Sequence, residues 1–158
     1  MIRPGTAENA AAVAGVQIAS WQEAYKHLFT EEQLAAISLP DRTEFWRRFP
    51  PTVAEVEGEV VGFVTVGTAH DDPDADGELY AIYVLPDHWG TGVGRALMES
   101  GEARLQELGH SRVILWVWED NPRARRFYEA AGWTADGLAK DAEFWGMSGR
   151  VVRYAKTL

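Results

Sequence analysis

Apolar residues recur along the first part of the chain at the three- and four-residue spacing of an amphipathic helix. Thr6 stands just before this stretch, at a position where a side-chain oxygen is favoured as N-cap. Residues 30–49 then predict one or two short helices, with Thr30 as a cap and Pro40 as a break before Asp41. The apolar positions of the first helix are Ala10, Val13, Ala14, Ile18, Trp21 and Tyr25.

After this helical region the hydrophobic period changes to two, which is the spacing of a strand with one buried face. Residues 53–57 and 60–67 follow this alternation, and the Gly58-Glu59 pair between them predicts the turn of a β-hairpin. Helical patterns come first along the chain and strand patterns come second. This order favours a mixed fold, α+β or α/β, built from packed layers.

The middle of the chain combines a polar loop, a buried strand and a helix. Residues 70–77 are acidic and rich in turn-forming residues, which predicts a surface loop. From Glu78 to Leu85 the chain is apolar on both faces and then meets Pro86, as expected of a central strand. Beyond a glycine-rich turn, one face of a helix that ends at Gly109 is marked by Gly94, Leu97, Met98, Gly101, Leu105 and Leu108.

The C-terminal part adds further strands and one helix. Residues 112–118 form an apolar run of strand length. Asn121 suits the N-cap of the following helix, and Pro122 suits its first turn, because the N–H that proline lacks would have no acceptor there. Two more strands are expected within residues 133–143 and 150–157.

A chain of 158 residues without linkers or repeats has the size of a single domain, which we place at residues 1–158. Its net charge of −9 argues against a nucleic-acid partner, because binding to phosphate backbones needs clustered positive charge. The same charge mildly favours a cationic substrate. The chain has no cysteine, so disulfides and thiolate metal sites are excluded.

The sequence also bears on the cellular location. No apolar run approaches the roughly 18 residues that span a bilayer, and the first residues lack the basic and apolar regions of a secretory leader. We therefore expect a cytoplasmic protein with no membrane partner. Asp72, Asp74 and Asp76 resemble the start of a calcium loop, but Tyr83 stands where its final glutamate would be, so no metal site is expected.

The most informative stretch leads from the buried strand through the glycine-rich turn into a helix, LYAIYVLPDHWGTGVGRAL at residues 79–97. Glycines let backbone N–H groups approach a ligand closely, and a helix N-terminus carries partial positive charge. A phosphate or pyrophosphate is therefore the expected ligand, and Arg95 adds a cation. A tight turn without a ligand is the alternative explanation of the alternating glycines taken alone.

Two common phosphate-binding motifs do not fit this turn. A Walker A loop needs Gly-Lys followed by Ser or Thr, and the chain contains no such triplet. A dinucleotide fingerprint, G-x-G-x-x-G, needs a third glycine at a position where the chain has Arg95 or Leu97. Both nucleotide-binding interpretations are thereby excluded.

These residues resemble the GNAT superfamily of N-acetyltransferases, whose central motif is Arg or Gln followed by x-x-Gly-x-Gly or Ala. Residues 89–94 read WGTGVG, so Gly92 and Gly94 fall on the motif glycines and Trp89 replaces the usual Arg or Gln. A second family motif resembles WVWEDNPRARRFYEAAGW at residues 116–133. The resemblance implies a GNAT-like fold of the mixed α/β (α+β) class, in which helices flank a twisted, mostly antiparallel central sheet of about six to seven strands.

The resemblance further implies acetyl-CoA as the cofactor, together with the residues that bind it. In the family, amides of the glycine turn hold the pyrophosphate of coenzyme A, and the preceding strand pairs with its pantetheine arm. An asparagine at the start of the later helix is a further cofactor contact. In this chain the corresponding cofactor-binding residues are Ile82, Tyr83, Val84, Trp89, Gly90, Thr91, Gly92, Val93, Gly94, Arg95 and Asn121.

Similarity to the family also assigns the catalytic roles. Tyr128 stands where relatives often carry the general acid that protonates the departing thiolate, and Glu78 stands where many carry the general base. A base or a water relay is needed because an alkyl amine is almost fully protonated at neutral pH. Glu23, Glu143 and His88 are the alternatives for the base.

The acceptor is expected to be a primary amine of a small molecule or peptide, which receives the acetyl group directly, without a covalent enzyme intermediate. The resemblance places its pocket near Trp21, Tyr25 and Phe29, at the end of the first helix. A noncatalytic acyl-CoA-binding or regulatory module of the same fold is the main alternative, since fold alone does not prove activity. The identity of the amine stays open, and so does a homodimer, which many relatives form.

Overall fold

The computed structural model describes residues 1–70 and 72–158, which form two compact units. In this part of the chain, no helix combines the length and the apolar composition needed to cross a bilayer. A single domain over the whole chain stays a prediction. Unit 1 consists of Met1–Thr65 and Ala81–Gly101, and unit 2 consists of Val66–Tyr80 and Glu102–Leu158.

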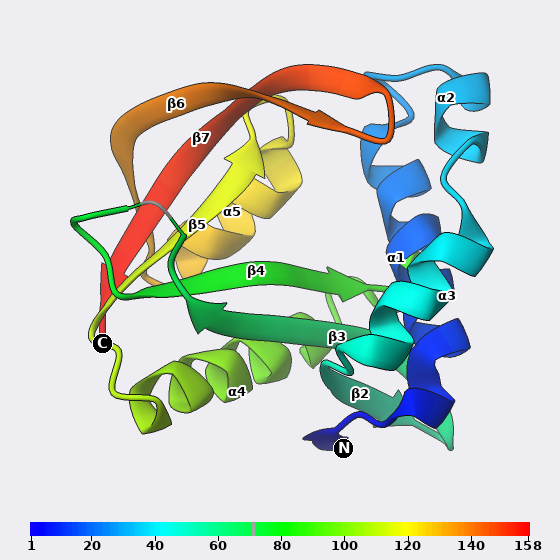
Figure 1. Cartoon of the computed structure of the whole chain (residues 1–158), viewed down its shortest axis with the longest axis horizontal. Helices are drawn as coiled ribbons and strands as arrows, with labels where there is room; N and C mark the ends of the chain where they lie inside the picture. Colours follow the sequence, from blue (N-terminus) through cyan, green and yellow to red (C-terminus); the bar gives the residue numbers. More distant parts are fainter. Residues whose placement is uncertain (71) are drawn as a thin grey trace. The chain divides into compact units, whose positions relative to one another are not determined.

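The chain passes between the two units inside regular elements (Figure 1), namely strands β3 (Glu59–Thr68) and β4 (Gly77–Val84) and helix α4 (Val93–Glu107). The other strands are β1 (Ile2–Pro4), β2 (Thr52–Val56), β5 (Arg112–Trp118), β6 (Thr134–Phe144) and β7 (Met147–Thr157). The strands hydrogen-bond in the order β1-β2-β3-β4-β5-β7-β6. Among the pairings whose register is described, β4 with β5 is parallel and the others are antiparallel. This confirms the mixed class and the mostly antiparallel sheet.

Unit 1 packs two helices, α1 (Ala10–Tyr25) and α3 (Leu39–Arg48), onto strands β2 and β3. The helices lie side by side in Figure 1. Trp46 of α3 places its ring 4.9 Å from that of Phe63, and its Nε1 donates to Gln17 Oε1 at 2.8 Å. The polar atom of this buried ring is therefore satisfied, as burial of a tryptophan requires. The fully buried cluster contains Ala10, Val13, Ala14, Val16, Trp46, Val53 and Phe63.

The short helices begin at capping residues. Helix α2 (Glu31–Ala35) follows Thr30, whose Oγ1 accepts a backbone N–H of the first turn at 3.1 Å, as predicted. Helix α3 follows Ser38, whose Oγ accepts the Asp41 N–H at 3.1 Å. Pro40 therefore lies in the first turn of α3, and the predicted break before Asp41 is wrong. Proline fits there because the N–H that it lacks would have no intrahelical acceptor.

Both hairpin turns pair a larger residue with a glycine, and all four residues have positive φ. The β2–β3 turn consists of Glu57 (φ +52°) and Gly58 (φ +81°), one position earlier than the predicted Gly58-Glu59 turn. The β6–β7 turn consists of Trp145 (φ +51°) and Gly146 (φ +81°). Two consecutive residues with positive φ twist in the same sense as the strands, so they close a tight hairpin without splaying it.

The sheet of unit 2 has two chemically different faces. Paired residues point to the same side of a sheet, so the register places Trp116 of β5 and Arg153 of β7 together on one face. Tyr154, the next residue along, points to the other face, where helix α5 (Pro122–Ala130) lies and Arg125 Nε donates to Tyr154 Oη at 3.1 Å. Figure 1 shows β6 and β7 side by side, as their register requires.

A buried ion cluster lies on the face that carries Arg153. The Arg153 side chain is 7% exposed, and its guanidinium forms ion pairs with Asp72 and Asp136. The distance from Arg153 Nε to Asp136 Oδ2 is 2.5 Å. Burial lowers the pKa of Arg153, because a charge is costly to remove from water. The two carboxylates offset that cost, so the cluster joins the acidic loop of residues 72–76 to β6 and β7.

We expect Arg153→Met to lower the free energy of unfolding by about 3 kcal/mol, because Asp72 and Asp136, whose side chains are only 11% and 24% exposed, would then lose their cation. Urea unfolding at neutral pH measures the change. Arg95→Met is the control: its ion pair with Glu99 is exposed, so its removal should cost less than about 0.5 kcal/mol. Equal losses in the two variants would contradict the structural role of Arg153.

Candidate functional site

The turn between β4 and α4 presents an open stretch of backbone in unit 1. It contains Gly90 with φ +75° and Gly92 with φ +92°, in the left-handed region that favours glycine. A Cβ atom built on either residue would meet no atom within 4 Å. Backbone conformation therefore selects glycine here, and the turn faces open space. An exposed row of N–H groups of this kind suits a phosphate or pyrophosphate.

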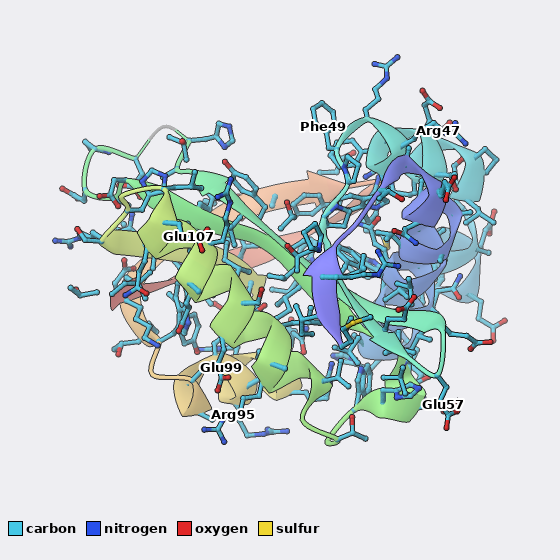
Figure 2. The ribbon with its side chains drawn as sticks, turned by 90° about the horizontal axis from the view of Figure 1, so that it is seen from below. Arg47, Phe49, Glu57, Arg95, Glu99 and Glu107 are labelled. Atoms are coloured by element: carbon cyan, nitrogen blue, oxygen red, sulfur yellow. The ribbon has the colours of Figure 1, made fainter. Side chains whose placement is uncertain are left out.

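Helix α4 begins directly after this turn. Ala96 donates its N–H to Gly92 O at 3.1 Å. The N–H groups of residues 93–95 come before this bond, and the first N–H groups of a helix have no acceptor within the helix. Arg95 Nε lies 3.2 Å from Glu99 Oε1, with the Arg95 side chain 84% exposed, and Figure 2 shows both side chains near this end of α4. Such an exposed pair is weak, so Glu99 does not hold Arg95 away from an anion.

The end of β4 is fixed by two side chains that donate to one carbonyl oxygen. Ser20 Oγ of α1 and Trp89 Nε1 of the turn each lie 2.8 Å from Val84 O. Ser20 is 2% exposed, so its hydrogen bond lies in the core. Trp89 occupies the position of the motif's Arg or Gln. Its side chain links the turn to the end of β4 through this hydrogen bond. Sequence reasoning missed Ser20, because nothing marks one serine of an apolar helix as the partner of a residue 64 positions away.

Glu78 lies half-buried near the start of β4, in unit 2, where it pairs with Ile114 of β5. Its Oε1 accepts the backbone N–H of His70 at 3.4 Å, a long hydrogen bond. Burial raises the pKa of Glu78, while the His70 hydrogen bond and the charges of His70 and Lys140 oppose that rise. A raised pKa increases the proton affinity of the carboxylate, as a base that works near neutral pH requires.

Tyr128 lies on α5 and is 8% exposed. Asn121 begins this helix as predicted, since its Oδ1 accepts the Ala124 N–H at 3.1 Å. Burial raises the pKa of Tyr128, and the positive charge of Arg123 opposes the rise, so the phenol keeps its proton throughout the neutral range. Within residues 1–70 and 72–158 its hydroxyl forms no hydrogen bond. Tyr128 is thus a protonated donor whose proton is not committed to the described protein.

The aromatic residues that sequence analysis placed near the acceptor form one packed cluster with the end of β4. Ring centroids are 4.6 Å apart for Trp21 and Tyr25, 6.2 Å for Tyr25 and Phe29, and 6.3 Å for Trp21 and Tyr83. Trp21 and Tyr25 are only 4% and 3% exposed. Phe29 and Tyr83 are partly exposed, so they offer the accessible surface of this cluster.

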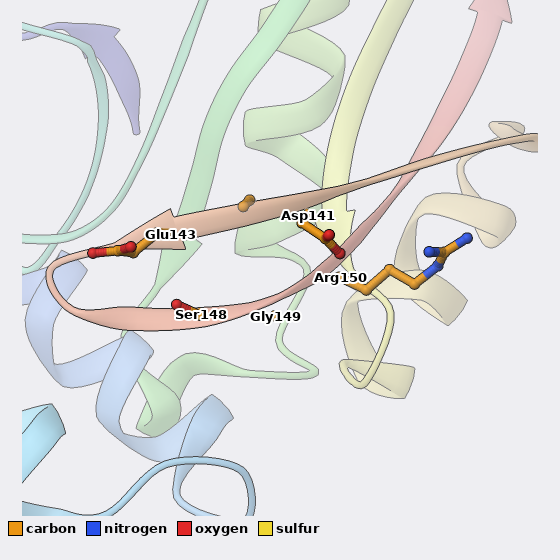
Figure 3. A pocket seen from close by; sticks show the side chains of 6 residues that line it. Asp141, Glu143, Ser148, Gly149 and Arg150 are labelled. Atoms are coloured by element: carbon orange, nitrogen blue, oxygen red, sulfur yellow. The ribbon is translucent and has the colours of Figure 1, made fainter.

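The alternatives for the base lie in different surroundings. Glu23 is exposed and pairs with Lys26 at 2.6 Å, and His88 belongs to a short 3-10 turn before the glycines. Glu143 lies on the β6–β7 hairpin and lines an open hollow with a volume of about 560 Å³. Figure 3 shows the side chains around this hollow. Arg150 is one of the lining residues and pairs with Glu119 at 3.3 Å. The hollow is lined by Asp141, Ala142, Glu143, Ser148, Gly149 and Arg150.

Comparison with known proteins identifies related sequences. Residues 15–133 match the model of the acetyltransferase (GNAT) family. The uncharacterised N-acetyltransferase YuaI of Bacillus subtilis is 29% identical over 145 residues, which cover 89% of this chain and 82% of that protein. Mycothiol acetyltransferase of Geodermatophilus obscurus is 45% identical over 64 residues, but these cover 40% of this chain and only 21% of that longer protein.

Solved structures share the fold over the whole chain. The PaiA N-acetyltransferase of Thermoplasma acidophilum, solved in complex with coenzyme A, superposes with a TM-score of 0.78 at 16% identity, covering 100% of this chain and 98% of that one. A GCN5-related N-acetyltransferase of Rhodopseudomonas palustris reaches a TM-score of 0.80 at 25% identity, covering 100% and 95%. Likeness at these identities establishes the architecture.

Trp89→Phe should raise the dissociation constant for coenzyme A by about three- to tenfold, because it removes one hydrogen bond from Val84 O and loosens the turn. Isothermal titration calorimetry measures the change. Trp133→Phe is the matched control: it removes an indole donor to Glu102 at 3.0 Å in unit 2 and should lower stability without changing this affinity. Unchanged affinity in Trp89→Phe would remove the side chain from this role.

Glu78→Gln should raise the melting temperature at pH 8 and leave it nearly unchanged at pH 4. The folded-state pKa of Glu78 lies above its unfolded value, so the charged carboxylate destabilises the fold once the pH exceeds the unfolded pKa, and a neutral amide removes that penalty. Glu99→Gln, on an exposed side chain, is the control and should show no such pH dependence. A lower melting temperature at pH 8 would show that Glu78 stabilises the fold.

Proposed function

This chain belongs to the acetyltransferase (GNAT) family of N-acetyltransferases, and we propose that it transfers an acetyl group from acetyl-CoA directly to a primary amine of a small molecule or peptide. Residues 1–158 act together as one N-acetyltransferase domain in this proposal. The observation that carries it is the open glycine turn at the start of α4, in a chain whose residues 15–133 match the family.

The proposed cofactor site begins at this turn. Backbone N–H groups of residues 90–95 bind the pyrophosphate of coenzyme A, with Arg95 as an added cation. The N–H of Trp89 already donates to Pro86 O at 3.1 Å, so Trp89 contributes to the site through its side chain. Backbone groups of Ile82, Tyr83 and Val84 bind the pantetheine arm, and Asn121 is a further contact. The cofactor supplies an acetyl thioester, which is already activated for attack by an amine. The open space around Gly90 and Gly92 supports this assignment, because a side chain there would obstruct approach to the backbone.

Glu78 and Tyr128 are the proposed base and acid. Glu78 takes a proton from the ammonium form of the acceptor, directly or through water, so that a neutral amine is available. Its raised pKa supports this role. Tyr128 gives its proton to the departing thiolate, and its uncommitted hydroxyl supports that role. Backbone N–H groups of β4 stabilise negative charge on the carbonyl oxygen while the new bond forms.

The acceptor is proposed to lie against the aromatic cluster of Trp21, Tyr25 and Phe29. Trp21 and Tyr25 are buried, so they shape the wall, and Phe29 offers surface to the ligand. The role proposed for these side chains is to supply contact area, and no proton transfer is assigned to them. The amine that relatives such as mycothiol acetyltransferase use is not carried over, since that match covers 40% of this chain.

Tyr128→Phe should lower kcat by about 10²-fold with little change in the affinity for acetyl-CoA, because it removes a proton donor and keeps the buried ring. The loss should lie at the lower end for such donors, since a thiolate with a pKa near 8.5 leaves fairly well unaided. Thiol release from acetyl-CoA across a panel of primary amines measures it.

Tyr154→Phe is the matched control for this experiment. It removes a hydroxyl that Arg125 and Glu129 already bind, on a ring 6.1 Å from that of Tyr128, and should reduce stability without lowering kcat. A fall below threefold in Tyr128→Phe would exclude Tyr128 from the mechanism. Stabilisation by acetyl-CoA without product from any amine would refute the transferase activity and indicate a binding module.

A further inference from the structure

The register of the unit 2 sheet gathers three side chains on one face. Glu78 pairs with Ile114, and Trp116 follows Ile114 by two residues, so Glu78 and Trp116 point to the same side. Trp116 pairs with Arg153, and Val151, two residues before Arg153, pairs with Lys140 of β6. Lys140 therefore points to this face too. Helix α5 contacts the opposite face through Arg125 and Tyr154.

Lys140 is held over an aromatic ring on this face. Its Nζ lies 4.1 Å from the centroid of the Trp116 ring, in cation–π geometry. Its charge acts on Glu78, whose pKa it lowers against the effect of burial. Lys140 is exposed, and within residues 1–70 and 72–158 it forms no hydrogen bond or ion pair. An ammonium group has three N–H donors, so this site has spare capacity for an anion.

Three other cations of unit 2 are used differently. Arg153 is buried between two carboxylates, and Lys156 donates to Glu102 Oε1 at 2.7 Å and to Ala131 O at 2.8 Å. Arg150 pairs with Glu119. These contacts tie elements of the unit together. Within residues 1–70 and 72–158, Lys140 makes no such tie, and its described interactions are those with the Trp116 ring and with the charge of Glu78.

We propose that Lys140 binds a carboxylate of the acceptor, so that the substrate class is small amino carboxylates. The amine of such a molecule lies toward Glu78, and its carboxylate lies at Lys140, whose Nζ is held over the Trp116 ring. This inference rests on the proposed N-acetyltransferase function. It is compatible with the chain's net charge of −9, because an amino carboxylate carries one positive and one negative charge at neutral pH.

The test uses matched pairs of acceptors, α-amino and ω-amino carboxylates each compared with its carboxamide. For the wild-type protein and for Lys140→Met, the ratio of kcat/KM for the acid to kcat/KM for the amide is measured by thiol release. Comparing this ratio between the proteins cancels differences in amine pKa within a pair. We expect Lys140→Met to lower the ratio by about 10- to 100-fold, the usual effect of one charge-assisted hydrogen bond.

Two further variants separate a direct contact from general electrostatics. Arg150→Met removes one positive charge from β7, the neighbouring strand of the same hairpin. Arg150 pairs with Asp141, the residue after Lys140, so it points to the opposite face of the sheet, and its removal should leave the ratio unchanged. Lys140→Glu should lower the ratio further than Lys140→Met, because it places a like charge at the carboxylate. Circular dichroism confirms that each variant is folded.

The outcomes distinguish this inference from the proposed function. If amines are acetylated but the ratio is the same in wild type and Lys140→Met, or falls equally in Arg150→Met, the carboxylate site is refuted and the transferase function stands. If no amine, acid or amide yields product, both are refuted. A ratio that falls only in the Lys140 variants supports the site.

Discussion

The carbonyl of Val84 is the point on which the geometry of the glycine turn depends. A backbone carbonyl has two lone pairs, and here Ser20 and Trp89 occupy both, from the helix packed on the strand and from the turn itself. The strand end is thus held from two directions before the chain enters a segment with open space around its glycines. Trp89 takes part through an intramolecular bond, so replacement of the motif's Arg or Gln leaves the backbone of the turn supported.

Burial acts on both proposed proton-transfer groups and has opposite chemical consequences for them. The pKa of Glu78 rises toward the range where a carboxylate accepts protons usefully, while the pKa of Tyr128 rises farther from neutrality and keeps the phenol protonated. One physical effect, the cost of charge in a poorly solvated place, therefore gives one group the character of a base and the other that of an acid. The charge of Lys140 opposes this effect at Glu78, so the cation proposed to bind a carboxylate also acts on the proposed base.

Features set by neighbours in the sequence could be predicted from it. Asn121 and Thr30 cap the helices assigned to them, and the strand, glycine turn and helix around residues 78–107 lie where the pattern placed them. The helix break predicted at Pro40 was wrong because Ser38 caps α3 and Pro40 lies in the first turn of that helix. The local sequence allows proline either in a first turn or at a break. The roles of Ser20, Lys140 and Arg153 could not be predicted, because each depends on a partner from a distant segment and on strand register, which no local spacing encodes.

The crossings of the chain between the two units limit how this protein can have diversified. The chain changes unit within β3, β4 and α4, inside hydrogen-bonded elements rather than in linkers. A recombination event at any of these points would cut a ladder or a helix, so neither unit can be exchanged as a module. We expect insertions instead at tight turns that lie within one unit, such as Glu57-Gly58 and Trp145-Gly146. New specificities in such a chain therefore arise by side-chain replacement on a sheet face or by lengthening of hairpins.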